Sequence, residues 1–194
     1  DPIEFVHDVN KKGVVNQRQV GRDTASFANA LRGALREDPD IIIIGELRDT
    51  ETISLALTAA ETGHLVIGTM STSNAQKTID RIIDAFPPDR QNQIRTMLAD
   101  SIKGIVTQRL IKDKEGKKRV LATETMVGTV AVAAIIRDNK TFQLFSLIQT
   151  GKKSGMQLMD ESLAQLLKDG RISPEAAYAN AVSKKPCETA SKTK

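Results

Sequence analysis

The sequence is poor in the residues that build disulfides, zinc modules and base-stacking surfaces. Its 194 residues include one cysteine, Cys187, no tryptophan and 3% aromatic residues. A single cysteine excludes an internal disulfide and every multi-cysteine zinc module. Scarce aromatics disfavour the stacking of nucleic-acid bases. The two histidines, His7 and His64, lack a partner at metal-ligand spacing, and we expect His64 to serve a structural turn.

Long apolar runs and a strongly charged body are also missing. No apolar run approaches the roughly 20 residues that span a bilayer, and no basic-then-apolar leader opens the sequence. Of the net charge of +4, residues 183–194 contribute +3 through four lysines and one glutamate, which leaves +1 for residues 1–182. We therefore predict a disordered basic tail at 183–194, no nucleic-acid partner and a cytoplasmic location.

A phosphate-binding loop is absent as well. The pattern Gly-x-x-x-x-Gly-Lys-Ser/Thr, whose backbone cradles nucleotide phosphates, occurs nowhere in the chain. The sequence opens on Asp1 instead of methionine. We expect the chain to be a fragment of a longer protein.

The first half of the sequence alternates between strand and helix patterns. Residues 41–44 (Ile-Ile-Ile-Ile) and 65–68 (Leu-Val-Ile-Gly) predict strands buried on both faces, as in a parallel sheet. A helix capped by Asp49 or Thr50 follows the first strand, and residues 74–86 predict a helix after the second. This order predicts an α/β fold with a right-handed βαβ unit.

Other elements flank this core. Residues 14–20 predict a short strand, and Thr24 predicts the cap of the following helix. Residues 89–110 predict a long helix, because apolar residues recur there at helical spacing. These residues are Ile94, Leu98, Ile102 and Ile105. A charged turn at 112–118 precedes a strand pattern at 119–123.

Beyond Gly128 the pattern becomes entirely helical. Four short helices are predicted, at residues 129–138, 141–150, 158–168 and 173–182, and Ser173-Pro174-Glu175 is typical of a helix start. We therefore divide the chain into a core at 1–128, a small helical C-terminal subdomain at 129–182 and the tail.

The sharpest candidate for chemistry follows the first core strand. Glu46, Arg48 and Asp49 come directly after residues 41–44, and open parallel sheets bind ligands at the carboxyl ends of their strands. A carboxylate placed there can orient an attacking water or help to hold magnesium. The alternative is a strand end with a solvated acid that caps the next helix.

Hydroxyl residues follow the second core strand. Thr69, Ser71 and Thr72 stand where they could sense a phosphate. The alternative is plain helix capping by Ser71, Thr72 or Ser73. Because both strands end in polar clusters, the two clusters together favour a site.

Four stretches of the sequence resemble the secretion and type IV pilus motor ATPases, a family of hexameric RecA-like enzymes. Residues 1–5 resemble the end of its acidic box, and residues 34–49 resemble its Walker B region. Residues 58–66 with 78–81 resemble its His box, and residues 154–163 its C-terminal helical region. Assembly and type II secretion members usually carry a four-cysteine zinc module, so the lone Cys187 makes this chain more similar to the pilus-retraction branch.

The resemblance implies a fold, ligands and site residues. It implies a partial RecA-like parallel-sheet core, with ATP and Mg²⁺ as ligands and the phosphate-binding loop upstream of Asp1. The implied catalytic carboxylates are Glu46 and Glu4, with Mg²⁺ held through the nucleotide near Glu46 and not by direct protein ligation. The implied nucleotide-binding residues are Thr69, Ser71, Thr72, Arg18, Arg22 and Arg81. The Walker B residues are Ile43, Ile44, Gly45, Glu46, Arg48 and Asp49. The His-box residues are Gly63, His64, Thr69, Ser71, Asp80 and Arg81.

The resemblance also implies a biological role. A homo-hexamer would couple ATP hydrolysis to type IV pilus retraction and twitching motility, with an inner-membrane platform protein as partner. It would associate only peripherally with the inner face of the bacterial inner membrane. The alternative is a non-catalytic ring subunit or regulatory module of the same machinery. Two departures bear on this choice: Ser71 stands where the family has a histidine, and Ala133-Ala134 replace an Arg-Asn pair.

Overall fold

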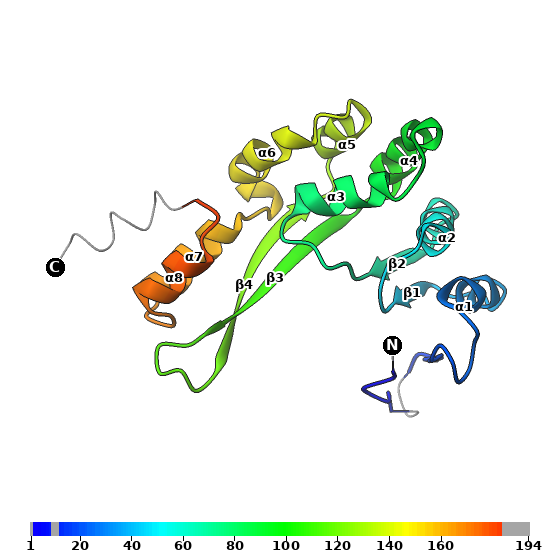
Figure 1. Cartoon of the computed structure of the whole chain (residues 1–194), viewed down its shortest axis with the longest axis horizontal. Helices are drawn as coiled ribbons and strands as arrows, with labels where there is room; N and C mark the ends of the chain where they lie inside the picture. Colours follow the sequence, from blue (N-terminus) through cyan, green and yellow to red (C-terminus); the bar gives the residue numbers. More distant parts are fainter. Residues whose placement is uncertain (1, 9–11, 184–194) are drawn as a thin grey trace. The chain divides into compact units, whose positions relative to one another are not determined.

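The computed structural model describes residues 2–8 and 12–183, and two compact units divide between Ser71 and Thr72 (Figure 1). The first unit contains α1 (Phe27–Ala34), β1 (Ile41–Ile44), α2 (Thr50–Glu61) and β2 (Leu65–Gly68). The second contains α3 (Ala75–Asp84), α4 (Pro88–Ser101), β3 (Gly104–Lys112), β4 (Arg119–Val127), α5 (Val130–Arg137), η1 (Thr141–Gln143), α6 (Leu144–Thr150), η2 (Lys152–Ser154), α7 (Met159–Lys168) and α8 (Pro174–Asn180). Within the described residues, none of the helices has the length and apolarity needed to cross a membrane. Apart from Ser183, the predicted tail at 183–194 lies outside the described residues.

The first unit is built on the predicted βαβ unit. β1 and β2 are parallel neighbours, with Ile41 opposite Leu65 and Ile44 opposite Gly68. α2 connects them and ends at Glu61. Gly63 follows its C-cap Thr62 with a φ of 106°, which suits a residue without a Cβ. The α/β prediction is confirmed.

The prediction that both strands are buried on both faces is wrong for this chain. Ile42 and Ile44 pack with residues of α1 and α2, whereas Ile43 on the opposite face is 71% exposed. Ile67, paired with Ile43, is also exposed. The helices of this unit cover only one face, so alternate residues of an all-aliphatic strand face solvent.

No strand forms at residues 14–20, where one was predicted. Side chains replace the expected ladder: Gln17 Oε1 and Gln19 Oε1 accept hydrogen bonds from the backbone N–H groups of His7 and Ile3, at 3.1 and 3.2 Å. The helix cap predicted at Thr24 lies instead at Ser26, whose hydroxyl accepts from Asn29 N at 3.1 Å.

The predicted helix over 89–110 is two elements. α4 ends at Ser101, Ile102 is extended, and β3 begins at Gly104. β3 pairs antiparallel with β4 over its whole length, from Gly104 opposite Val127 to Lys112 opposite Arg119. The long-range ladder outweighs local helical spacing, and β4 is correspondingly longer than the strand predicted at 119–123.

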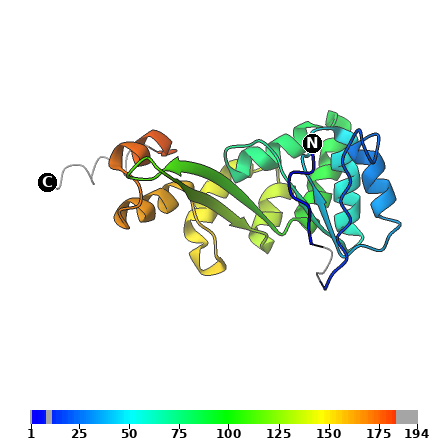
Figure 2. The same cartoon turned by 90° about the horizontal axis from the view of Figure 1, so that it is seen from below.

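The four predicted C-terminal helices are confirmed as α5, α6, α7 and α8, and Ser173 caps α8. α7 packs against β4 (Figure 2). Its Leu163 lies in a core with Ile111 and Val120 of the hairpin. Glycine is required at position 128, directly after β4, because a Cβ there would lie 2.2 Å from the carbonyl oxygen of Ile102. The division at residue 128 into core and helical subdomain differs from the division between the compact units and stays a prediction.

Candidate functional site

The carboxyl ends of β1 and β2 leave the sheet at the same edge, because the two strands are parallel and in register. Leu47 N donates to the carbonyl of Thr69 at 2.9 Å, and Thr69 N donates to the carbonyl of Ile44 at 3.4 Å. The Thr69 hydroxyl donates to the carbonyl of Gly45. These three hydrogen bonds fasten the two strand-end segments together, where open α/β sheets bind ligands.

Glu46 lies at this edge with its side chain 21% exposed and forms an ion pair with Arg48. The hydrogen bond that Arg48 donates to the Glu46 carboxylate raises the pKa of the Arg48 guanidinium. Arg48 is largely exposed, and ion pairs that are exposed to solvent contribute little to stability. The strand end therefore presents a carboxylate beside a guanidinium that is weakly held and accessible.

Asp49 is the cap of α2. Its carboxylate accepts from Thr52 N at 2.8 Å and from the Thr52 hydroxyl at 2.7 Å. Partial burial raises the pKa of Asp49, but the hydrogen bonds from Thr52 and from the backbone N–H groups of Asp49 and Glu51 together lower it below its usual value. The capping alternative is thus correct for Asp49, and Glu46 remains the candidate for chemistry.

The capping alternative for the hydroxyl cluster after β2 is wrong. α3 is capped by Asn74, whose side-chain oxygen accepts from Lys77 N at 2.8 Å. Ser71 is exposed, and the hydroxyl of Thr72 shares a hydrogen bond of 2.6 Å with that of Thr78. Ser71 and Thr72 are therefore not explained by helix capping.

His64 has the structural role expected of it. Its Nδ1 lies 3.0 Å from the carbonyl oxygen of Ala59 and 3.3 Å from the Thr62 hydroxyl, just after Gly63. These contacts fix the turn between α2 and β2, and so the start of the strand that Thr69 follows.

The two predicted phosphate-contacting arginines of the first unit form ion pairs within it. Arg18 pairs with Glu37, and this hydrogen bond lowers the pKa of Glu37. Arg22 pairs with Asp23, with 2.9 Å between Nη2 and Oδ2. Glu4 is exposed and has no hydrogen bond or ion pair with any other described residue.

The remaining predicted site residues belong to the second unit. Asp80 accepts from the Gln76 side chain at 3.4 Å, and Arg81 is exposed on α3. The structure thus brings together one group of predicted site residues at the edge of the first unit. They are Gly45, Glu46, Arg48, Asp49, Thr69 and Ser71. Thr72, Asp80 and Arg81 lie in the second unit, and Glu4, Arg18 and Arg22 are not joined to the strand-end group by any of the contacts above.

One buried polar residue was missed by the sequence analysis. Glu124 in β4 is 6% exposed and is the only charged residue among the buried described residues. Alternation along β4 places it on the same face as Ala122 and Met126. This alternation is visible only over the full length of β4, whereas the strand predicted from the sequence ended at Thr123.

The residues that follow β1 and β2 suit the binding of the phosphates of a nucleotide with bound Mg²⁺. Within residues 2–8 and 12–183, no three His, Cys, Asp or Glu side chains cluster as a metal site. Mg²⁺ usually keeps several waters and takes one or two carboxylates together with substrate phosphates. The carboxylate of Glu46 and the hydroxyls that follow β2 suit that arrangement, while the backbone cradle for the phosphates is not part of this chain.

Comparison with known proteins identifies related sequences and structures. Residues 1–165 match the family described as "Type II/IV secretion system protein". The chain is 53% identical over 181 residues to a twitching motility protein of Neisseria gonorrhoeae, covering 93% of this chain and 48% of that protein. It is 55% identical over 181 residues to a type IV pilus retraction ATPase of Pseudomonas aeruginosa, covering 93% and 52%.

A solved structure agrees with these sequence matches. A crystal structure of the pilus retraction motor PilT with bound ADP superposes with a TM-score of 0.87 at 48% identity, covering 97% of this chain and 53% of that one. The chain therefore spans about half the length of the relatives that it matches.

Proposed function

Because the chain belongs to the type II/IV secretion system protein family, we propose that it is the C-terminal part of a motor ATPase that couples ATP hydrolysis to type IV pilus retraction, and hence to twitching motility. Its fold is the α/β arrangement of that family, a partial RecA-like core. The support for retraction in particular is the identity of 53–55% to a twitching motility protein and a pilus retraction ATPase.

The observation that carries the catalytic part of the proposal is the joined edge of β1 and β2. Hydrogen bonds between the segments after the two strands hold Glu46 and Thr69 at one edge. In this proposal the Glu46 carboxylate orients the attacking water, while Thr69, Ser71 and Thr72 contact the γ-phosphate. Bound Mg²⁺ would neutralise charge on the phosphates.

Residues away from this edge have subsidiary roles in the proposal. Glu4 would contribute to an acidic box. Arg18, Arg22 and Arg81 would contact phosphate or a neighbouring subunit. Since Arg18 and Arg22 are paired with Glu37 and Asp23, each would have to exchange its partner to do so.

The proposed assembly is a homo-hexameric ring at the cytoplasmic face of the bacterial inner membrane. Its partner would be the inner-membrane platform protein of the pilus, with peripheral membrane association only. No role in nucleic-acid binding is proposed.

The second candidate is a non-catalytic ring subunit or regulatory module. It is favoured by Ser71, which stands where the family's His box has a histidine. A serine has a shorter reach and cannot carry a proton near neutral pH as histidine does.

The test is Glu46→Gln in the complete protein, meaning this chain together with the half that its relatives possess. This variant keeps the shape and removes the charge that orients water. We expect at least a ~100-fold loss of phosphate release, the scale of a positioned acid–base group, with ATP affinity retained in calorimetry.

The matched control is Glu115→Gln, because the Glu115 side chain is 71% exposed in the turn between β3 and β4. It should hydrolyse ATP at the unmodified rate. If both variants kept full turnover, Glu46 would not be the catalytic carboxylate. If the unmodified complete protein itself failed to hydrolyse ATP, the non-catalytic candidate would stand.

A further inference from the structure

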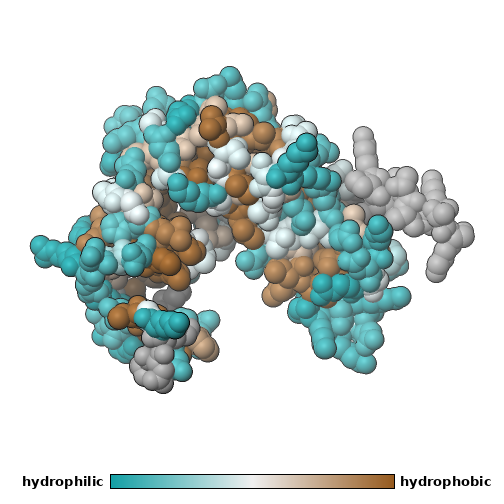
Figure 3. All heavy atoms as spheres, turned by 180° about the vertical axis from the view of Figure 1, so that it is seen from behind, coloured by the Kyte–Doolittle hydropathy of each residue, from teal (hydrophilic) through white to brown (hydrophobic). Residues whose placement is uncertain are grey.

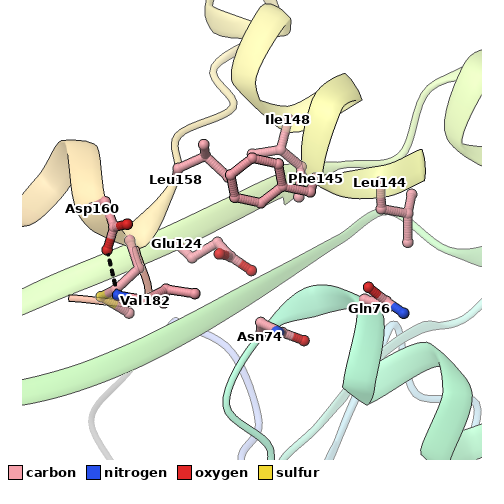
Figure 4. Close-up of a pocket in the computed structure, with 10 residues that line it drawn as sticks. Asn74, Gln76, Glu124, Leu144, Phe145, Ile148, Leu158, Asp160 and Val182 are labelled. Atoms are coloured by element: carbon pink, nitrogen blue, oxygen red, sulfur yellow. Dashed lines mark hydrogen bonds between the residues drawn. The ribbon is translucent and has the colours of Figure 1, made fainter. Parts of the chain in front are cut away.

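The second compact unit contains a half-open pocket that the proposed ATPase function does not use. Its empty volume is about 430 Å³, including the part that is open to solvent (Figure 4). The start of α3, strand β4, α6, the start of α7 and the segment after α8 surround it.

One wall of the pocket is apolar and well anchored. Leu144 and Ile148 of α6 and Leu158 before α7 are all at most 5% exposed. Phe145, 46% exposed, forms the rim of the same wall (Figure 4). This wall can cover an aliphatic stem without rearranging.

The other side is polar and acidic. Figure 4 shows the Glu124 carboxylate between the apolar wall and the amide side chains of Asn74 and Gln76. Asp160 also lines the pocket, and its two oxygens accept from the backbone N–H groups of Val182 and Ser183 at 2.7 and 2.8 Å. The lining contains two carboxylates and no lysine, arginine or histidine.

Glu124 lacks a counterion among the described residues. Its Oε1 accepts one hydrogen bond, from Ala75 N at 2.8 Å, and no described lysine or arginine pairs with it. A buried carboxylate is costly unless it is paired, and one amide offsets only part of that cost. A bound cation would supply the missing partner.

We propose that this pocket binds an organic cation, an ammonium or guanidinium group on an aliphatic stem. The cationic head would lie against Glu124 and the amides of Asn74 and Gln76, and the stem would lie against Leu144 and Phe145. The two sources of this chemistry are a lysine or arginine side chain of a neighbouring protein and a free alkylamine.

The experiment is a titration of the full 194-residue chain, followed by amide NMR shifts. The probes are n-pentylammonium, neutral 1-pentanol of the same length, and Nα-acetyl-lysine amide. We expect n-pentylammonium to shift the amides of Asn74, Gln76 and Glu124 and to bind at least ~10-fold more tightly than 1-pentanol, because a charged hydrogen bond is worth more than a neutral one. Binding of the capped lysine as well assigns the site to protein side chains. Binding of the alkylamine alone assigns it to free amines.

Glu124→Gln separates charge from shape, since the glutamine oxygen still accepts from Ala75 N. We expect it to weaken n-pentylammonium at least ~10-fold and leave 1-pentanol unchanged. Phe145→Ala should weaken both probes, and Phe142→Ala, on an exposed residue outside the lining, should weaken neither.

Three outcomes would overturn the proposal: equal affinity for the alcohol and the amine, an unchanged amine affinity in Glu124→Gln, or no shifts at the pocket. If Glu124→Gln fails to fold, the comparison of amine with alcohol and the Phe145→Ala and Phe142→Ala pair still decide. None of these results depends on ATP hydrolysis.

Discussion

The two compact units each bury one face of a small sheet, but the buried cluster of the first unit has five residues and the cluster under the hairpin of the second has eight, among the described residues. In the second unit Val106, Leu110 and Leu121 on the other face of the hairpin are exposed, and in the first unit four aliphatic side chains of β1 and β2 are exposed. The four are Ile41, Ile43, Leu65 and Ile67, each at least 44% exposed. Figure 3 shows hydrophobic side chains gathered over β1 and β2 on the face seen there. In the second unit the apolar face of the hairpin is completed by residues such as Leu163 and Ile172.

The smaller core of the first unit indicates that this unit depends more on further protein than the second does. The exposed face of the first unit belongs to the sheet whose strands are followed by Glu46 and Thr69. The relatives are about twice as long as this chain. We expect the unmatched part of such a protein to cover that face. The second unit has its own core and should hold its structure without it.

The largest expected effect compares a buried residue of the second unit with an exposed strand residue of the first. Leu163→Ala should destabilise the second unit by ~2–5 kcal/mol, because Leu163 is 1% exposed. Ile43→Ala should lower the unfolding free energy of the 194-residue chain by no more than ~0.5 kcal/mol, because surface substitutions usually change it by less than that. Native-state amide exchange reads each unit separately.

In the complete protein the same Ile43→Ala change should cost several-fold more, since its face would then be covered. An equally small loss of stability in the 194-residue chain and in the complete protein would mean that this face of β1 stays exposed. The comparison of the units would then give no evidence that the rest of the protein covers it.

A smaller effect compares the helix caps of the two units. Asp49→Ala and Asn74→Ala should each cost ~1 kcal/mol, in α2 and α3 respectively. Only the first carries a charge: the pKa of Asp49 in the folded state is lowered from its unfolded value of about 3.9. That contribution is fully present above the unfolded pKa and is lost as the pH falls through the folded pKa.

Melting curves at neutral pH and at acid pH below about 3 test this, with Asp49→Asn as the matched variant that keeps an acceptor without the charge. Asp49→Asn should reduce the acid sensitivity of the first unit, and Asn74→Ala should not change that of the second. The same acid sensitivity in both Asp49 variants and the unmodified chain would assign the titration to another group.

The smallest effect concerns Ser71, at the end of the first unit. Because Asn74 caps α3, Ser71→Ala should leave the melting temperature unchanged. In the complete protein it should slow turnover by about 5-fold, equivalent to the ~1 kcal/mol of one neutral hydrogen bond. Ser71→His should change turnover or its cooperativity more than ATP affinity. A lower melting temperature with normal kinetics would return Ser71 to a structural role.

The sequence predicted the elements whose signals are local. Consecutive isoleucines at 41–44, the glycine after α2 and the Ser173-Pro174-Glu175 start of α8 each specify their structure through neighbouring residues. The placement of Glu46 and Thr69 at one sheet edge also followed from the sequence, because parallel strands put their carboxyl ends together.

Capping positions were harder to predict, since several capping residues stand in a row. Ser26 and not Thr24 caps α1, and Asn74 and not Ser71, Thr72 or Ser73 caps α3. Each of these side chains can accept from a helix amide, and the path of the chain into the helix selects one of them.

What the sequence alone determined is therefore the βαβ unit, the succession of C-terminal helices and the position of Glu46 after β1. The tertiary structure decided where partners far away in the sequence take part. The apolar spacing that predicted a helix over 89–110 runs on to Ile105, yet residues 104–112 form β3 because β4 offers nine paired residues. Residues 14–20 form no strand, and the side chains of Gln17 and Gln19 accept hydrogen bonds from the backbone of His7 and Ile3 there. Glu124 is buried because β4 extends past Thr123 and packs against α3. Burial and strand pairing depend on which elements pack together and not on local sequence.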